Sequence, residues 1–267
     1  MSPVAHHIVD GPVEFKFDAD LKHAVSRFPA EWRMESWPAP VTGTGSVDDE
    51  RAFGMTPLVV IVGADKGGVG KTTIARTLLD YLDSKGIKNR AFDTENAIKE
   101  GVLRRFFPDR TSIVDLTDSD GQMQIFDTLG AEVTVIDIRA SLLSPTLKLL
   151  NEIGFLDPAK CRIVVLHILG NSQASIGEVK SITESIASSR YVAIANHITE
   201  TKFAFPAGAL DIPMLNARAI ESVDAASMSF MSYINSGASS VLRGYVKFWL
   251  GVVFQHFDAA QLHHIEA

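Results

Sequence analysis

The sequence predicts an α/β fold in which a doubly wound, mostly parallel β-sheet is flanked by helices on both faces. Short apolar runs rich in β-branched residues recur along the chain, and segments with a helical spacing of apolar residues separate them. Buried strands of parallel sheets have this continuous apolar character, and each crossover between parallel strands needs a connection long enough for a helix. Two of the runs end in an aspartate, Asp93 and Asp137, at the sheet edge where α/β proteins bind ligands.

The most informative motif lies where the first strand, at 58–62, ends and a helix begins. The connecting segment reads Lys66-Gly-Gly-Val-Gly-Lys-Thr-Thr73. Phosphate groups carry several negative charges, so a loop that binds them needs inward-pointing N–H groups and a backbone that can approach closely. Glycines meet that need, and the start of the helix adds a partial positive charge. A tight turn with a surface lysine is the alternative, but the pattern predicts phosphate binding by Lys66, Gly67, Gly68, Val69, Gly70, Lys71, Thr72 and Thr73.

This loop departs from the general pattern G-x-x-x-x-G-K-[ST]. The first glycine of that pattern would fall at Asp65, and an additional lysine, Lys66, follows it. With that lysine, the segment resembles the deviant phosphate-binding loop of the ParA/MinD family of ATPases, and the resemblance covers residues 57 to about 235. The resemblance implies a P-loop NTPase fold that binds ATP with Mg²⁺ and holds ADP after turnover. It also implies that Lys66 reaches across a nucleotide-dependent homodimer to the phosphates bound by the other copy; an exposed loop lysine is the alternative.

Other site residues follow from the motif and the resemblance. Lys71 is expected to reach the β- and γ-phosphates, and the Thr72 hydroxyl to ligate Mg²⁺. Asp137 resembles the acid that orders the metal through water. Asp93 matches the first acid of the family's Asp-x-Asp-Pro-x-x-Asn segment, and Glu95 stands in place of the second. The resemblance therefore implies that Glu95 or Asp93 positions water or metal near the γ-phosphate; the alternative is that both only cap a following helix.

Two features separate this chain from the typical partition ATPases. Asp137 follows Asp93 by only 44 positions, and this short interval, with the string Asp-Thr-Glu-Asn, is closer to the TraL-like plasmid-transfer branch. The family usually has a small residue and a proline after the second aspartate, but here Ile138-Arg-Ala-Ser141 follows. Arg139 is therefore expected either near the γ-phosphate or in a salt bridge elsewhere.

Two positions further along the chain are expected near the base. Asn196 follows an apolar strand at 191–195 and resembles the family's base-contacting residue, although a loop asparagine that bonds nearby backbone is an equal alternative. Pro213 lies in Asp211-Ile-Pro-Met-Leu215, which resembles the family's last short strand. Guanine-specific loops use Asn-Lys-x-Asp, which the chain lacks, so adenine is the expected base.

The remaining elements divide the chain into an N-terminal extension and linker at 1–56, of unknown role, and an ATPase domain at 57–267 that ends in a helix. A further strand is expected at 162–169, and helices at 119–129, from about 176 to 187, and at 217–234. The segment 97–107 is expected to be a helix with a solvated basic face. The last helix, at 241–257, is apolar on most faces and has few basic residues, so it is expected to pack in a core or oligomer and not on a membrane.

Composition sets broad limits on function. With 267 residues, of which 46% are hydrophobic, the chain can bury a sizeable core, and its single cysteine, Cys161, excludes an internal disulfide. The net charge of −7 disfavours a protein that coats nucleic acid, although a local basic patch is compatible with it. The sequence has neither a signal peptide pattern nor an apolar run of roughly 18–20 residues, so a cytoplasmic location is expected.

Together these features predict an ATP-binding protein that hydrolyses Mg·ATP slowly. Through the resemblance, nucleotide state is expected to control homodimerisation and the binding of an unidentified protein partner, in plasmid partition, conjugative transfer or cargo positioning. One alternative is an adaptor that binds nucleotide without turnover, because Glu95 and Arg139 depart from the family pattern. Another is an ATP-dependent small-molecule ligase or amidase of the same superfamily, although Cys161 lies in a strand and forms no glutaminase-like Cys/His pair.

Overall fold

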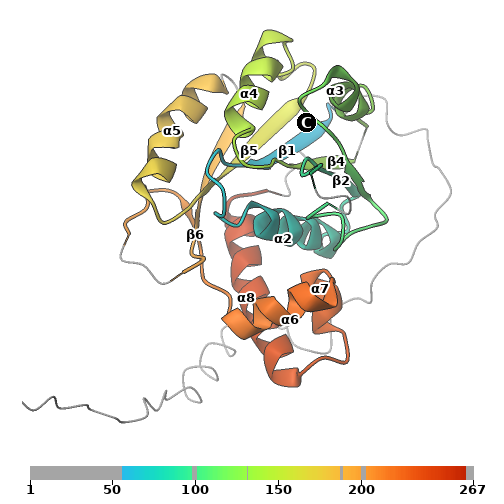
Figure 1. The fold of residues 1–267 in the computed structure, drawn as a ribbon, viewed down its shortest axis with the longest axis vertical. Coiled ribbons are helices and arrows are strands. Elements are labelled where there is room, and N and C mark those ends of the chain that lie inside the picture. The colour runs from blue at the N-terminus through green and yellow to red at the C-terminus, as the bar shows by residue number, and fades with distance from the viewer. Residues whose placement is uncertain (1–55, 98–100, 131, 187–188, 200–202, 263–267) are drawn as a thin grey trace, which may run out of the picture. The chain divides into compact units, whose positions relative to one another are not determined.

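The computed structural model of the chain describes residues 56–97, 101–130, 132–186, 189–199 and 203–262. Its centre is a seven-stranded sheet in the order β3-β2-β4-β1-β5-β6-β7 (Figure 1). Every pairing in this sheet is parallel, so the predicted doubly wound α/β fold is confirmed and the sheet is parallel throughout. The strands are β1 (Leu58–Gly63), β2 (Asn89–Asp93), β3 (Thr111–Ile113), β4 (Val133–Asp137), β5 (Arg162–Leu169), β6 (Arg190–Asn196) and β7 (Leu210–Ile212).

Helices cover both faces of the sheet (Figure 1). They are α2 (Lys71–Ser84), α3 (Ser119–Phe126), α4 (Leu143–Glu152), α5 (Gln173–Ser185), α6 (Ala217–Ala226), α7 (Phe230–Ile234) and α8 (Ser240–Ala259). On one face, Val59 and Ile61 of β1 join a buried cluster with residues of α3, α4 and α5. On the other face, α2 packs against the sheet and against α8, where Tyr81 meets the rings of Phe254 and Phe257 edge-on. The alternation of side chains along β1 therefore supplies both halves of the core.

The prediction of a helix at 97–107 is wrong for residues 97 and 101–107, the part of this segment that the structure describes. Residues 101–110 form turns and bends instead. One carboxylate oxygen of Asp93 accepts the backbone N–H groups of Val102, Leu103 and Arg104 at 2.6, 2.6 and 3.2 Å, and Gly101 has φ +67°. Three N–H groups that converge on one oxygen hold a tight turn, and the chain leaves this turn directly for β3.

Two further differences concern helices near the C-terminus and after β4. The helix expected at 217–234 is split into α6 and α7, because Ser227 adopts φ +48° and the Ser229 side chain caps α7. The helix α4 was not anticipated from the sequence.

The strand expected at 162–169 is confirmed as β5, and Cys161 before it is buried. Burial raises the pKa of the Cys161 thiol to about 11.

The extension expected at 1–56 lies outside the described residues except for Thr56. Within the residues that the structure describes, none of the helices combines the length and apolar character that a membrane span requires.

Candidate nucleotide-phosphate site

The segment 64–70 joins the C-terminal end of β1 to the first residue of α2 and contains the glycine-rich loop at 66–70. Gly68 and Gly70 have φ angles of +72° and +85°, and Gly70 is the N-cap residue of α2. Side chains with a Cβ rarely adopt such angles, so these two positions need glycine to turn the chain back over the end of the strand. Lys66, Gly67 and Gly68 are exposed, whereas Val69 is buried against Gly170. The predicted arrangement of strand, glycine-rich loop and helix is thereby confirmed.

A cavity of about 270 Å³ opens beside this loop. It is bounded by the ends of three adjacent strands, β2, β4 and β1, at the carboxyl edge of the sheet, where α/β folds bind ligands. The cavity thus brings together predicted residues that are up to 70 positions apart in the sequence. Its lining consists of Gly67, Gly68, Gly70, Lys71, Thr72, Thr73, Asp93, Glu95, Val102, Asp137, Ile138, Arg139 and Ala140.

The residues expected to bind the metal lie together in this cavity. The Thr72 hydroxyl donates to the Asp137 carboxylate at 2.7 Å. Asp137 is only 4% exposed, and this burial raises its pKa to about 7, although the Thr72 hydrogen bond and the charge of Lys71 act in the opposite direction. Among the described residues there is no cluster of three or more His, Cys, Asp or Glu side chains that forms a ready metal site. A cation held by Thr72 and Asp137 therefore needs oxygen ligands from water or from a phosphate.

Among the described residues, Lys71 is one of the two cationic side chains that line the cavity; Arg139 is the other. Its ammonium group donates to the carbonyl oxygen of Lys66 at 3.3 Å, across the base of the loop. Partial burial lowers the pKa of Lys71, and the charges of Asp137, Glu178 and Glu95 oppose that shift. A desolvated ammonium group surrounded by carboxylates fits the binding of an anion that brings its own divalent cation.

Asp93 and Glu95 have different environments at the end of β2. Asp93 is 1% exposed; besides the three N–H groups of the 102–104 turn, it accepts the N–H of Glu95 at 3.0 Å through its other oxygen. Both Asp93 oxygens are therefore engaged with backbone groups, but those of residues 102–104 belong to a turn, and the described residues 101–110 contain no helix for Asp93 to cap. Glu95 is half-buried and lines the cavity. The geometry makes Glu95 the better placed of the two to contact a ligand, and the predicted roles of both stay predictions.

Arg139 lies at the rim of the same cavity. Its guanidinium donates to the side-chain oxygen of Asn96 at 3.0 Å, and Asn96 donates in turn to Asp115 at 2.5 Å. The backbone N–H of Arg139 donates to the Thr94 hydroxyl at 2.8 Å. These bonds attach the segment after β4 to the segment after β2. They hold Arg139, which was expected either near the γ-phosphate or in a salt bridge elsewhere, at the wall of the cavity.

The two residues expected at the base make other contacts. Asn196 is 3% exposed, and its amide donates to the carbonyl oxygen of Val69 at 2.8 Å. The carbonyl of Pro213 accepts the indole N–H of Trp249 at 2.6 Å. Neither residue lines the phosphate cavity. Asn196 thus holds the backbone of the loop at Val69. Base contact by Asn196 or Pro213 stays a prediction.

Three residues in or beside the loop were not predicted from the sequence as site residues: Asp65, Ser144 and Glu178. Asp65 accepts hydrogen bonds from the backbone N–H of Ser144, at 3.1 Å, and from its hydroxyl, while Glu178 accepts the N–H of Asp65 at 3.1 Å. Glu178 also lies 3.4 Å from Nε2 of the fully buried His167, whose pKa is lowered by burial. An aspartate in place of the pattern's first glycine was the one signal in the sequence for these contacts.

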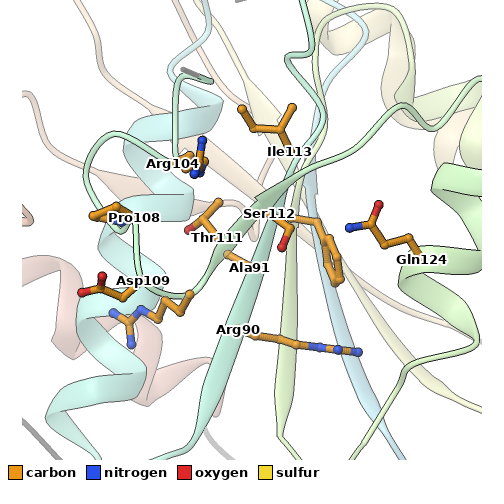
Figure 2. Close-up of a pocket in the computed structure, with 11 residues that line it drawn as sticks. Arg90, Ala91, Arg104, Pro108, Asp109, Thr111, Ser112, Ile113 and Gln124 are labelled. Atoms are coloured by element: carbon orange, nitrogen blue, oxygen red, sulfur yellow. The ribbon is translucent and has the colours of Figure 1, made fainter. Parts of the chain in front are cut away.

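A second, larger cavity of about 610 Å³ lies along the edge strand β3. Figure 2 shows Arg104 and Pro108 on one side of this edge and Gln124 on the other. Two of its three arginines are already engaged: Arg110 binds Asp83 through two bonds of 2.5 and 2.6 Å, and Arg90 donates to Thr128. It shares no lining residue with the phosphate cavity. The smaller cavity, which holds the motif, is therefore the candidate site.

The sequence matches no protein-family model and no curated protein. Among solved structures, the chain is similar to the MinD cell division protein of Aquifex aeolicus, at 13% identity and a TM-score of 0.42, over 73% of this chain and 98% of that one. It is also similar to a nucleotide-binding protein from Archaeoglobus fulgidus in complex with ADP, at 14% identity and a TM-score of 0.36, over 73% of this chain and 87% of that one. At these values the fold assignment rests on the strand order and pairing of the chain itself.

Proposed function

We propose that this chain is an ATPase of the ParA/MinD type that binds Mg·ATP in the 270 Å³ cavity and hydrolyses it slowly. The observation that carries the proposal is the hydrogen bond of 2.7 Å between Thr72 and Asp137, beside the ammonium group of Lys71 and the glycine-rich loop. A hydroxyl that ligates Mg²⁺ and a carboxylate that orders its water shell form the pair expected at the mouth of a loop that binds a nucleotide with Mg²⁺. A tight turn with a surface lysine does not account for this pair.

Each residue of the cavity then has a role in phosphoryl transfer. Lys71 and the loop N–H groups hold the β- and γ-phosphates, and the start of α2 adds its partial positive charge. Thr72 and Asp137 would hold Mg²⁺, which supplies positive charge to the phosphate oxygens when bound. Glu95 accepts the proton of the attacking water, and Asp93 holds the backbone of Glu95 in place. Asp137 binds a cation as a carboxylate, so metal binding at this buried acid is coupled to loss of its proton.

Nucleotide state is proposed to control association. Lys66 is exposed at the tip of the loop, so its side chain is available to the phosphates bound by a second copy. Such a contact exists only when the γ-phosphate is present, which makes the dimer depend on ATP. Adenine as the base, an unidentified protein partner, a cytoplasmic location and a role in partition, transfer or cargo positioning follow from the family resemblance and complete the proposal. Assignment to the TraL-like plasmid-transfer branch belongs to the same proposal.

The test compares two lysines of the loop with an exposed lysine elsewhere. Calorimetry of the full chain should detect Mg·ATP binding that is stronger than Mg·GTP binding. Lys71→Ala should abolish it, whereas Lys66→Ala should retain it and lower phosphate release by about tenfold or more. Lys148→Ala, at a side chain that is 78% exposed on α4, serves as the matched control and should behave as the unmodified chain.

Light scattering with ATP and with ADP tests the switch. The proposal is supported if the protein forms a dimer with ATP, if the dimer dissociates with ADP, and if Lys66→Ala prevents the dimer from forming. Nucleotide binding without phosphate release would favour the adaptor, and release that requires a carboxylate co-substrate would favour the ligase. The absence of nucleotide binding by well-folded protein would overturn all three.

A further inference from the structure

Asp65 connects the phosphate loop to the helix that follows β4. The carboxylate accepts two hydrogen bonds from Ser144, in the first turn of α4, and the backbone carbonyl accepts the N–H of Ser141 at 3.0 Å. The backbone N–H of Asp65 donates to Glu178 of α5 at 3.1 Å. Every polar group of Asp65 is thus bonded to a segment far away in the sequence.

The contact with Asp65 lies at the start of α4, where the first N–H groups need an acceptor. Its own N-cap residue, Leu142, provides no side-chain hydrogen bond. The first N–H groups of a helix have no partner within the helix, and a negative charge near them is favourable. The Asp65 carboxylate supplies the missing acceptor to the N–H of Ser144. The residue that replaces the pattern's first glycine is therefore the cap of a different helix.

The same contact fixes the next residue, Lys66. On one side, Asp65 is bonded to α4 and α5; on the other, the carbonyl of Lys66 accepts the ammonium group of Lys71 at 3.3 Å. A Cβ on Gly67 would lie 3.6 Å from the Cβ of Ala140, so the loop also touches the segment after β4. The backbone of Lys66 is held on both sides, while its side chain is exposed.

The segment that Asp65 binds is part of the site. It begins directly after Asp137, and its residues Ile138, Arg139 and Ala140 line the cavity. Ser141 adopts φ +68°, a strained conformation for a residue other than glycine. Strain of this kind persists where several contacts fix the backbone, and the bond from the Ser141 N–H to Asp65 is one such contact.

From these contacts we infer that Asp65 is a positioning residue of the proposed ATPase. It ties the phosphate loop to the start of α4 and so fixes the direction of Lys66. This role rests on the proposed function, because it concerns the lysine that is proposed to act across the dimer. It makes Asp65 act through Lys66, with no contact of its own with nucleotide, and Asp65 does not line the cavity.

The first experiment measures the tie itself and needs no nucleotide. Hydrogen exchange of the full chain is compared between Asp65→Asn, which keeps the size and removes the charge, and Glu152→Gln, an exposed carboxylate on the same helix α4. We expect Asp65→Asn to speed amide exchange in segments 64–70 and 138–144 by about tenfold, and Glu152→Gln to leave both unchanged. Unchanged exchange in both segments of Asp65→Asn would overturn the inference. Ser144→Ala, which removes only the hydroxyl donor, should show a smaller change in the same direction and serves if Asp65→Asn does not fold.

The second experiment separates positioning from binding. Asp65→Asn should lower kcat by about tenfold and change KM by less than about twofold. The double variant Asp65→Asn/Lys66→Ala should be no slower than Lys66→Ala alone, because residues that act through one group are not additive. Losses that multiply, or a loss confined to KM, would overturn the positioning role. If the unmodified chain binds no nucleotide, the positioning role falls with the proposed function, whereas the exchange experiment still decides whether Asp65 ties the loop to α4.

Discussion

The hydroxyl of Thr72 donates a hydrogen bond of 2.7 Å to the carboxylate of Asp137 and thereby joins the first turn of α2 to the end of β4. In an apo site this bond holds the two proposed metal ligands on the same side of the cavity. We expect Thr72→Ala to weaken Mg²⁺ binding by about 10- to 100-fold, whereas Thr72→Ser should retain most of it, because serine keeps the hydroxyl. Nucleotide binding titrated against Mg²⁺ concentration is the measurement. Identical Mg²⁺ dependence in the alanine and serine variants would remove Thr72 from the metal site.

Glu95 is the acid that faces the cavity with its side chain half-buried. The change Glu95→Gln keeps its size and removes its ability to accept a proton. We expect kcat to fall by about 10²- to 10⁴-fold, as for the loss of a general base, with nucleotide affinity preserved. Phosphate release and calorimetry on one preparation distinguish the two effects. Glu132→Gln, at a carboxylate that pairs with Arg90 outside the cavity, is the control, and equal turnover in the two variants would exclude Glu95 as the base.

The two left-handed glycines of the loop differ in what surrounds them. A Cβ on Gly70 would lie 2.2 Å from the Asn196 amide nitrogen, whereas a Cβ on Gly68 would meet nothing within 4 Å. Gly68→Ala should lower the free energy of unfolding only by the cost of the left-handed conformation, about 1–2 kcal/mol. Gly70→Ala should cost that amount and also about 1 kcal/mol for the displaced bond between Asn196 and Val69. Urea unfolding measures both, and Asn196→Ala should return part of the added cost in the double variant. Equal decreases in the free energy of unfolding for the two glycine variants would show that displacing the Asn196 amide has no measurable effect on stability.

Asp80 gives the protein a pH-dependent component of stability. It is 1% exposed, accepts the N–H groups of Phe230 and Met231 at the start of α7, and burial raises its pKa from 3.8 to about 7. Because the folded state binds the proton more tightly than the unfolded state, the stability from this group is present below about pH 4 and is lost as the pH rises to about 7. We therefore compare the free energy of unfolding of Asp80→Asn with that of the unmodified chain. This difference should shift in favour of the variant by on the order of 3 kcal/mol as the pH is raised from 5 to 8. Urea unfolding at the two pH values measures this change, and a difference that does not vary with pH would contradict it.

The sequence carries the β1–loop–α2 unit in adjacent residues, and for this reason it could be predicted. The apolar run at 58–62 and the glycines that follow it need no information from the rest of the chain. The meeting of Thr72 and Asp137 could also be predicted, because parallel strands present their carboxyl ends at one edge. The predicted α/β fold follows from the same regular alternation.

Long-range contacts account for what could not be predicted. Asp65 and Ser144 are 79 positions apart, and Asp65 and Glu178 are 113 apart, so no local pattern relates them. The turn at 101–110 has a helical spacing of apolar residues, but the buried Asp93 oxygen collects its N–H groups and overrides that local preference. The amide of Asn196 had two equal interpretations in the sequence, and only its bond to the Val69 carbonyl places it behind the loop.

The bond from the Trp249 indole to the Pro213 carbonyl gives the domain an optical reporter. The other two tryptophans, Trp32 and Trp37, precede residue 56, so replacing both by phenylalanine leaves a single emitting indole. Its fluorescence then reports on the backbone that follows β7, the segment assigned to the base by family resemblance. Movement there on nucleotide uptake becomes visible in real time without any attached dye.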